Sequence, residues 1–357
     1  MSRILSIGTA VPQYAHGQTQ IMEFMQRVYA LDETGNRKLR FLYRQSGIGT
    51  RYSVIPDYSL PAEEWEFFPA SENLQPFPAL EQRMSWYRRH ATPLSIDAIN
   101  DCLGDRDPNS ITHLITVSCT GLSAPGLDID IMRAMSLPVT TQRYSINFMG
   151  CYAAVQALKM ADAFCKADPM AVVLIVCTEL CTLHFQKDPV PDNITSSMLF
   201  GDGSAAVLVA GGPGEGTAIT HFHSAIADKG INDMSWEVSS KGFLMTLSSY
   251  VPDLIEQDFN TLLENALSTG AVGRDEIGAW CIHPGGKKIL EAVAKSAALP
   301  EGSLTHSYDV LREYGNMSSP TILFVLGRML REGNHNGKIA GAAFGPGLTM
   351  ETFILTP

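Results

Sequence analysis

One cysteine stands at a position where a helix could make it reactive. The segment Met149-Gly-Cys-Tyr-Ala-Ala154 places Cys151 at the start of a predicted apolar helix. Free backbone N–H groups and the helix dipole favour the thiolate there, which is the nucleophilic form of the side chain. Cysteine is also among the most frequently buried residues, so position alone leaves a purely structural role open.

Two other polar residues have chemistry that complements a thiol. His283 follows a predicted buried strand and precedes a Pro-Gly-Gly turn, and Asn316 follows a glycine at a predicted helix entrance. An imidazolium beside Cys151 would strengthen the thiolate, and the histidine N–H and the amide could both donate to an oxyanion or enolate. A neutral amide suits a carbanion and so favours C–C bond formation. A structural role for His283 and an N-cap role for Asn316 remain alternatives.

Short apolar runs alternate with longer helical patterns along the chain. The runs are 114–117, 172–176, 205–209, 279–282 and 352–355. This alternation predicts an α/β fold whose strands are buried on both faces by helices. The segment 211–217 holds four glycines and a proline after one such strand, so we expect a boundary there, with halves 1–212 and 213–357.

Three features of the first half recur in the second. A glycine turn precedes a strand, a glycine and a polar residue precede an apolar helix, and a polar residue ends a strand. The pairs are 200–209 with 344–355, Gly150-Cys151 with Gly315-Asn316, and Ser118-Cys119 with His283. These echoes predict two duplicated α/β halves packed face to face in a layered αβαβα arrangement. The three candidate residues would then meet at the shared seam.

Composition excludes several classes of protein. The 357 residues are 45% apolar and 18% charged, which suits a large globular core, and the net charge of −11 makes nucleic acid an unlikely partner. The longest apolar run, 170–177, is far below the roughly 20 residues of a membrane span. Seven scattered cysteines without zinc spacing, and no secretory h-region, predict a cytoplasmic protein with free thiols.

Five motifs together resemble one enzyme family. They are Phe148-Met-Gly-Cys-Tyr-Ala153, Leu199-Phe-Gly-Asp-Gly203, Ile282-His-Pro-Gly-Gly286, Tyr314-Gly-Asn-Met-Ser-Ser319 and Ala343-Phe-Gly-Pro-Gly-Leu-Thr-Met-Glu351. The sequence resembles a bacterial-type member of the type III polyketide synthases, the chalcone and stilbene synthase-like family. The resemblance implies a thiolase-like fold, a homodimer, acyl-CoA and malonyl-CoA substrates, and no metal or redox cofactor.

The resemblance also implies roles for individual residues. Cys151 would hold the growing chain as a thioester, while His283 and Asn316 would promote malonyl decarboxylation. The polyketide would then cyclise to a pyrone-, resorcinol- or phloroglucinol-type product. Phe200 would be an aromatic gatekeeper beside the three.

Five of the seven residues at the family's pocket positions depart from the plant pattern, while Phe200 and Ser318 match the family. The pocket positions are Phe200, Cys119, Cys181, His184, Trp236, Met245 and Ser318. Cys119, Cys181 and His184 stand where plant members often have threonine, so a plant-type aromatic starter is not implied. Lys38 matches a basic residue that binds CoA phosphates in the family, and Arg44 lies close to it in the sequence.

Other functions fit parts of the pattern. A ketoacyl-ACP synthase III shares the Cys-His-Asn set but uses a carrier protein, and the Phe-Gly-Pro-Gly ending argues against it. A papain-like cysteine hydrolase has the same residue order, yet Tyr152 replaces the usual tryptophan and the cysteine count is odd. A non-catalytic binding protein with a thiolase-like fold is a third alternative, but such a protein would not need Cys, His and Asn together.

Overall fold

The structure is a computed structural model that describes residues 2–71, 73–333 and 336–357. Its centre is one mixed sheet of nine strands. The strand order is β11 (Ile277–Ile282), β12 (Lys338–Gly345), β13 (Thr349–Thr356), β8 (Thr217–Ile226), β1 (Arg3–Ala10), β7 (Asp202–Ala210), β6 (Val172–Leu180), β4 (His113–Ser118) and β5 (Gln142–Asn147). The five apolar runs all lie within these strands, so those predictions are confirmed.

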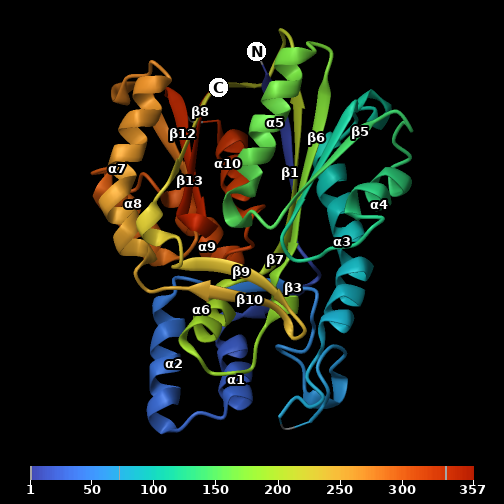
Figure 1. Ribbon diagram of the computed structural model, residues 1–357, viewed down its shortest axis with the longest axis vertical. Coiled ribbons are helices and arrows are strands. Elements are labelled where there is room, and N and C mark those ends of the chain that lie inside the picture. Colours follow the sequence, from blue (N-terminus) through green and yellow to red (C-terminus); the bar gives the residue numbers. More distant parts are fainter. Residues whose placement is uncertain (1, 72, 334–335) are drawn as a thin grey trace.

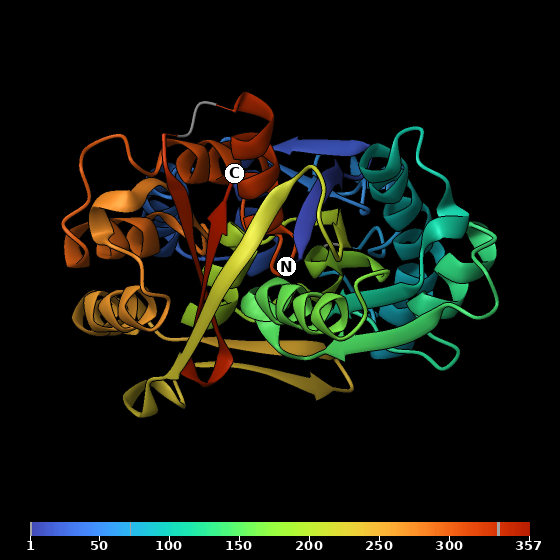
Figure 2. The ribbon, with the colours of Figure 1, turned by 90° about the horizontal axis from the view of Figure 1, so that it is seen from above.

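The helices form three layers around this sheet, with α5 (Ala153–Ala167) and α10 (Thr321–Glu332) in the middle. Figures 1 and 2 show α3 (Leu80–Leu103) and α4 (Leu127–Ala134) on one flank. On the opposite flank lie α7 (Val251–Thr269) and α8 (Lys287–Ser296), while α9 (Thr305–Tyr314) packs on α10. This is the predicted αβαβα arrangement.

The two parts of the sheet repeat one pairing pattern. In the first part, β1 pairs antiparallel with β7, β7 antiparallel with β6, and β6 parallel with β4. In the second part, β8, β13, β12 and β11 follow with the same orientations. Helices α5 and α10 occupy equivalent places, because each connects to the third strand of its own series. The predicted duplication is therefore present in the topology.

Smaller elements close the lower end of the molecule in Figure 1. They are helices α1 (Gln18–Tyr29), α2 (Glu33–Gln45) and α6 (Pro191–Leu199), and two small two-stranded sheets. One sheet pairs β2 (Tyr14–Gly17) with β3 (Thr50–Ser53), and the other is the hairpin of β9 (Met234–Ser239) and β10 (Gly242–Leu247). All seven cysteines are free and buried. Among the described residues, no helix has both the length and the apolar character needed to cross a membrane.

Candidate active site

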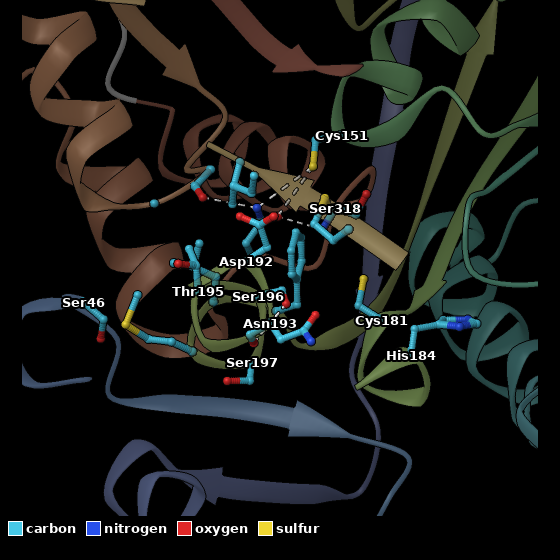
Figure 3. A pocket seen from close by; sticks show the side chains of 18 of the residues that line it. Ser46, Cys151, Cys181, His184, Asp192, Asn193, Thr195, Ser196, Ser197 and Ser318 are labelled. Atoms are coloured by element: carbon cyan, nitrogen blue, oxygen red, sulfur yellow. Dashed lines mark hydrogen bonds between the residues drawn. The ribbon is translucent and has the colours of Figure 1, made fainter. Parts of the chain in front are cut away.

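The three predicted catalytic residues line one cavity. Cys151 lies in the short 3-10 turn Gly150–Tyr152 that leads into α5, His283 directly follows β11, and Asn316 lies between α9 and α10. The Cys151 sulfur is 4.0 Å from both Oδ1 and Nδ2 of Asn316 (Figure 3). The structure thus brings together residues that are far apart in the sequence, at the seam between the two repeats.

The turn before Cys151 interlocks with a turn of the second repeat. Gly150 has a φ of +77°, and a Cβ there would lie 2.4 Å from Cδ of Pro346. A Cβ on Gly345 would lie 2.6 Å from the Tyr152 ring. Only glycine fits at either position without moving the turn, because each backbone approaches its neighbour at the same seam. The two glycine motifs therefore determine where the sulfur lies.

Backbone and side-chain hydrogen bonds fix the orientation of Asn316. Its backbone N–H donates to the Leu199 carbonyl at 2.9 Å, and its own carbonyl accepts from the N–H of Gly201 at 3.0 Å. Its side-chain oxygen accepts from the Ser318 N–H at 2.8 Å, while Nδ2 donates to the Gly285 carbonyl at 3.3 Å. Since Oδ1 is held by an N–H donor, the amide presents its NH₂ group as the donor available to a ligand.

Burial keeps both the thiol and the imidazole neutral. His283 is 1% exposed, neither ring nitrogen has a hydrogen-bond partner among the described residues, and burial lowers its pKa to about 3. Burial also raises the pKa of the Cys151 thiol to about 11, against the opposing effect of hydrogen bonds from Ser318 and Asn316. The sequence predicts a thiolate at this helix start, whereas the raised pKa favours the thiol, with burial as its largest cause.

The cavity has a volume of about 640 Å³ and a largely apolar wall. Every residue predicted for the pocket lies on that wall, namely Phe200, Cys119, Cys181, His184, Trp236, Met245 and Ser318. Helix α6 also lines this cavity. Figure 3 shows its residues Asp192, Asn193 and Thr195–Ser197 beside the cavity. The cavity therefore extends beyond the three candidate residues to the small helices of the lower end.

One wall of the cavity is closed by hydrogen-bonded aromatic residues. His184 donates from Nε2 to the Thr120 carbonyl at 2.8 Å, accepts at Nδ1 from the Phe243 N–H at 3.0 Å, and stacks on the Phe243 ring at 4.2 Å. Trp236 donates to the Cys119 carbonyl at 2.6 Å and pairs across the β9–β10 hairpin with Met245. These contacts hold the rings of His184, Phe243 and Trp236 in place on that side of the cavity.

A buried carboxylate that the sequence interpretation missed supports the site. Glu179 accepts hydrogen bonds from the Cys119 N–H, the Thr120 hydroxyl and the Ser319 hydroxyl, each at 2.8 Å. Burial raises its pKa to about 7. Glu179 thus ties the end of β4 to the loop that holds Asn316. The available signal was a single acidic residue within a mostly apolar strand.

The lysine and arginine residues that line the cavity are not the two that the sequence predicts for CoA binding. Lys38 and Arg44 are exposed on α2 and do not line the cavity, although their neighbours Leu42 and Gln45 do. The basic residues on the wall are Arg51, Lys287 and Lys288. The sequence interpretation did not include Lys287 and Lys288 among the site residues, although they directly follow the Pro-Gly-Gly turn after His283. A CoA role for Lys38 and Arg44 stays a prediction.

Comparisons with known proteins agree with this geometry. The family model described as chalcone and stilbene synthases, N-terminal domain, matches residues 1–213, and the corresponding C-terminal domain model matches residues 223–357. The chain is 27% identical to a 3,5-dihydroxyphenylacetyl-CoA synthase of Streptomyces toyocaensis over 99% of this chain and 89% of that protein. It is 28% identical to the alpha-pyrone synthesis polyketide synthase-like Pks18 of Mycobacterium tuberculosis, over 98% and 89%.

Solved structures give the same result. PKS-I of the brown alga Ectocarpus siliculosus superposes with a TM-score of 0.93 at 28% identity, covering 99% of this chain and 98% of that one. The 1,3,6,8-tetrahydroxynaphthalene synthase of Streptomyces coelicolor, a bacterial type III polyketide synthase, superposes with a TM-score of 0.86 at 26% identity, with 99% of each chain covered. The chain belongs to the chalcone and stilbene synthase family, the type III polyketide synthases.

Proposed function

We propose that this protein loads an acyl group from an acyl-CoA onto Cys151 and extends it by decarboxylative condensation with malonyl-CoA. The extended chain would cyclise to a pyrone-, resorcinol- or phloroglucinol-type product. The observation that carries this proposal is the Cys151 sulfur 4.0 Å from the Asn316 amide, in a largely apolar cavity. His283, whose ring nitrogens have no hydrogen-bond partner among the described residues, lines the same cavity. Relatives named for α-pyrone and 3,5-dihydroxyphenylacetyl-CoA synthesis support these product classes.

In the loading step, the neutral pair of Cys151 and His283 transfers one proton. The Cys151 thiol gives its proton to His283, and the sulfur attacks the acyl-CoA carbonyl to form a tetrahedral oxyanion. The amide of Asn316 donates to that oxyanion. Collapse expels the CoA thiolate, which takes the proton from His283, leaving an acyl thioester on Cys151 and free CoA.

In the extension step, malonyl-CoA loses CO₂ within the same cavity. The C–C bond to the carboxylate breaks, and its electron pair forms an enolate whose oxygen accepts hydrogen bonds from His283 and Asn316. Apolar walls favour the loss of charge from the carboxylate. The enolate carbon attacks the acyl thioester, the Cys151 thiolate leaves, and the chain is longer by two carbons.

The CoA part of the substrate would lie at the open end of the cavity. Lys287 and Lys288 line the wall beside the turn that follows His283. Lys38 and Arg44 lie on α2, whose last turn also contributes to the wall. The positive charge of these four side chains is opposite to the charge of the CoA phosphate groups.

A homodimer is the expected assembly. Strand β5 ends the nine-stranded sheet and pairs with β4 only, so its outer edge lacks a partner among the described strands. Four of its six residues are exposed, and Val139, shortly before it, is almost fully exposed. An edge of this kind is a common site of strand pairing between subunits. Sedimentation velocity at several concentrations tests this assembly.

Product analysis tests the function. The purified protein is incubated with a panel of acyl-CoA starters, from short aliphatic to long fatty acyl, and with labelled malonyl-CoA. We expect labelled CO₂ and a cyclic polyketide identified by mass spectrometry, both absent when malonyl-CoA alone is omitted. Hydrolysis of acyl-CoA without carbon–carbon bond formation would contradict the proposal.

A further inference from the structure

The end of helix α6 is bonded directly to the backbone of Asn316. The last residue of the helix is Leu199, and Phe200 follows it on the cavity wall. Phe200 forms a parallel bridge with Asn316. In this bridge the N–H of Asn316 donates to the Leu199 carbonyl, and the N–H of Gly201 donates to the Asn316 carbonyl. The backbone of residues 198–201, called the α6 exit below, therefore determines where Asn316 lies.

A buried arginine and a glutamine hold the opposite side of the α6 exit. Arg51, on β3, donates from Nη1 to the Phe200 carbonyl at 2.6 Å and from Nε to Oε1 of Gln18 at 3.0 Å. Gln18, the first residue of α1, donates from Nε2 to the Met198 carbonyl at 2.9 Å. These two carbonyls thus accept from Arg51 and Gln18, whereas the carbonyl between them accepts from Asn316.

Arg51 is a buried cation that forms no ion pair with a described residue. It is 3% exposed, and the carboxylate of Asp202, whose charge acts on it, accepts instead from the N–H groups of Val54 and Thr182. Burying a charge costs free energy unless hydrogen bonds compensate. The last carbonyls of a helix have no partner within it, and a cation there is favoured by the helix dipole. The bonds of Arg51 to the α6 exit therefore offset the cost of its burial.

The aliphatic part of Arg51 packs on the residue before Asn316. A Cβ on Gly315 would lie 2.9 Å from both Cγ and Cδ of Arg51, and Gly315 has a φ of +69°. A Cβ on Gly201 would lie 3.5 Å from Cβ of Arg51. One side chain thus contacts both backbone segments of the bridge. The alignment of these segments sets the position of the Asn316 amide, which lies 4.0 Å from the Cys151 sulfur.

We infer that Arg51, together with Gln18, is a positioning residue that holds the Asn316 amide and Phe200 in place through the α6 exit. This inference rests on the proposed function, in which Asn316 donates to the oxyanion and to the enolate. A role for Arg51 in binding CoA phosphates fits less well, because its guanidinium is buried and two of its nitrogens donate within the protein. Without Arg51 the Phe200 carbonyl loses a charged donor, so the α6 exit and Asn316 become free to shift.

Hydrogen exchange tests the positioning without any turnover. The two groups measured are the backbone N–H of Gly201 and that of Asn316, which form the bridge. Arg51→Met removes the charged donors and keeps an apolar stem. We expect both amides to exchange about tenfold faster or more, since a hydrogen bond from a charged group is lost. Arg51→Lys keeps the cation and a donor without the planar fork, so it should restore part of the protection.

A matched control removes another buried donor from the same helix. The hydroxyl of Tyr29 donates to Oγ of Ser197 at 3.1 Å and to the Asn193 carbonyl at 3.2 Å, both on α6 but outside the α6 exit. Tyr29→Phe should therefore leave exchange at residues 201 and 316, and CO₂ release, close to wild type. Circular dichroism and melting temperature check that each variant is folded.

A double-mutant cycle shows whether Arg51 acts through Asn316. Arg51→Met should lower kcat for CO₂ release from malonyl-CoA about tenfold or more, with KM changed less than about threefold. In an Asn316→Ala background, the same substitution should lower kcat less than about twofold further, because the amide that Arg51 positions is absent. A general loss of stability would instead lower CO₂ release equally in both backgrounds.

Three results would overturn the inference. They are wild-type exchange of the two amides in Arg51→Met, equal acceleration in Tyr29→Phe, and an equal loss of CO₂ release in both backgrounds of the cycle. If Arg51→Met does not fold, Gln18→Met takes its place with the same expected directions, because it removes the donor to the Met198 carbonyl and leaves Arg51 present. Absence of CO₂ release by the wild-type protein would refute the proposed function, and hydrogen exchange alone would then decide whether Arg51 holds Asn316.

Discussion

Two buried histidines line the same cavity and differ in their hydrogen bonds. Burial lowers the pKa of both His283 and His184 to about 3. Both nitrogens of His184 are bonded to backbone groups of Thr120 and Phe243, whereas neither nitrogen of His283 has a partner among the described residues. An unpartnered buried polar group costs free energy, so a histidine retained in that state calls for a ligand. The comparison teaches that burial and pKa alone do not separate a structural histidine from a reactive one.

Removing the Cys151 sulfur from the cavity that His283 also lines should have the largest effect. Cys151→Ala leaves no nucleophile to hold the chain, so we expect no detectable polyketide and an unchanged melting temperature. Product formation is measured by mass spectrometry. Cys181→Ala, which removes another thiol from the same wall, is the matched control and should keep activity within about tenfold. Equal loss in both variants would remove the distinction between the two thiols.

The same substitution at the two histidines should have opposite consequences. His283→Leu removes a donor to the enolate and should reduce CO₂ release from malonyl-CoA by about 10²–10³-fold, with unchanged or higher stability. His184→Leu leaves the Thr120 carbonyl and the Phe243 N–H unsatisfied, so the free energy of unfolding should fall by about 1–3 kcal/mol. Labelled CO₂ release and urea denaturation measure the two effects. Wild-type CO₂ release by His283→Leu would contradict its proposed role.

A negative charge in place of the neutral Asn316 amide tests the second proposed donor to the enolate. Asn316→Asp places a carboxylate where an enolate forms, so extension should slow by about a hundredfold, or roughly 3 kcal/mol of transition-state stabilisation. Single-turnover assays separate the loading of Cys151 from CO₂ release. Unchanged CO₂ release in this variant would show that the amide does not contact the enolate.

The smallest expected effect is on pH dependence, where the two histidines should behave alike. Each takes up a proton on unfolding below its unfolded pKa of about 6.5, because burial keeps it neutral in the folded state. The stability that each contributes is complete above that pH and is lost as the pH falls towards 3. Between pH 6 and pH 5, the unfolding free energy of each leucine variant should therefore fall by about 1.2 kcal/mol less than that of the wild type. A wild-type slope in either variant would show that this histidine is protonated when folded.

The sequence was sufficient for five strands of the central sheet and for the duplication, because these depend on local patterns. Apolar runs predict buried strands, and the glycine turns before Cys151 and Asn316 recur at equivalent places in the topology. Protonation could not be predicted, since it depends on how completely other segments bury Cys151. Glu179 was missed for the same reason, because only the folded chain shows its three hydrogen-bond donors.

The most direct test is to locate the acyl group after one acyl-CoA reacts with the protein. Cys119, Cys151 and Cys181 all line the cavity, and the Cys151 sulfur is 4.0 Å from the Asn316 amide. Rapid acid quenching, proteolysis and mass spectrometry identify the modified thiol. The proposed function predicts one acyl thioester per chain, on Cys151. An acyl group on Cys119 or Cys181, or no covalent adduct while products form, would contradict it.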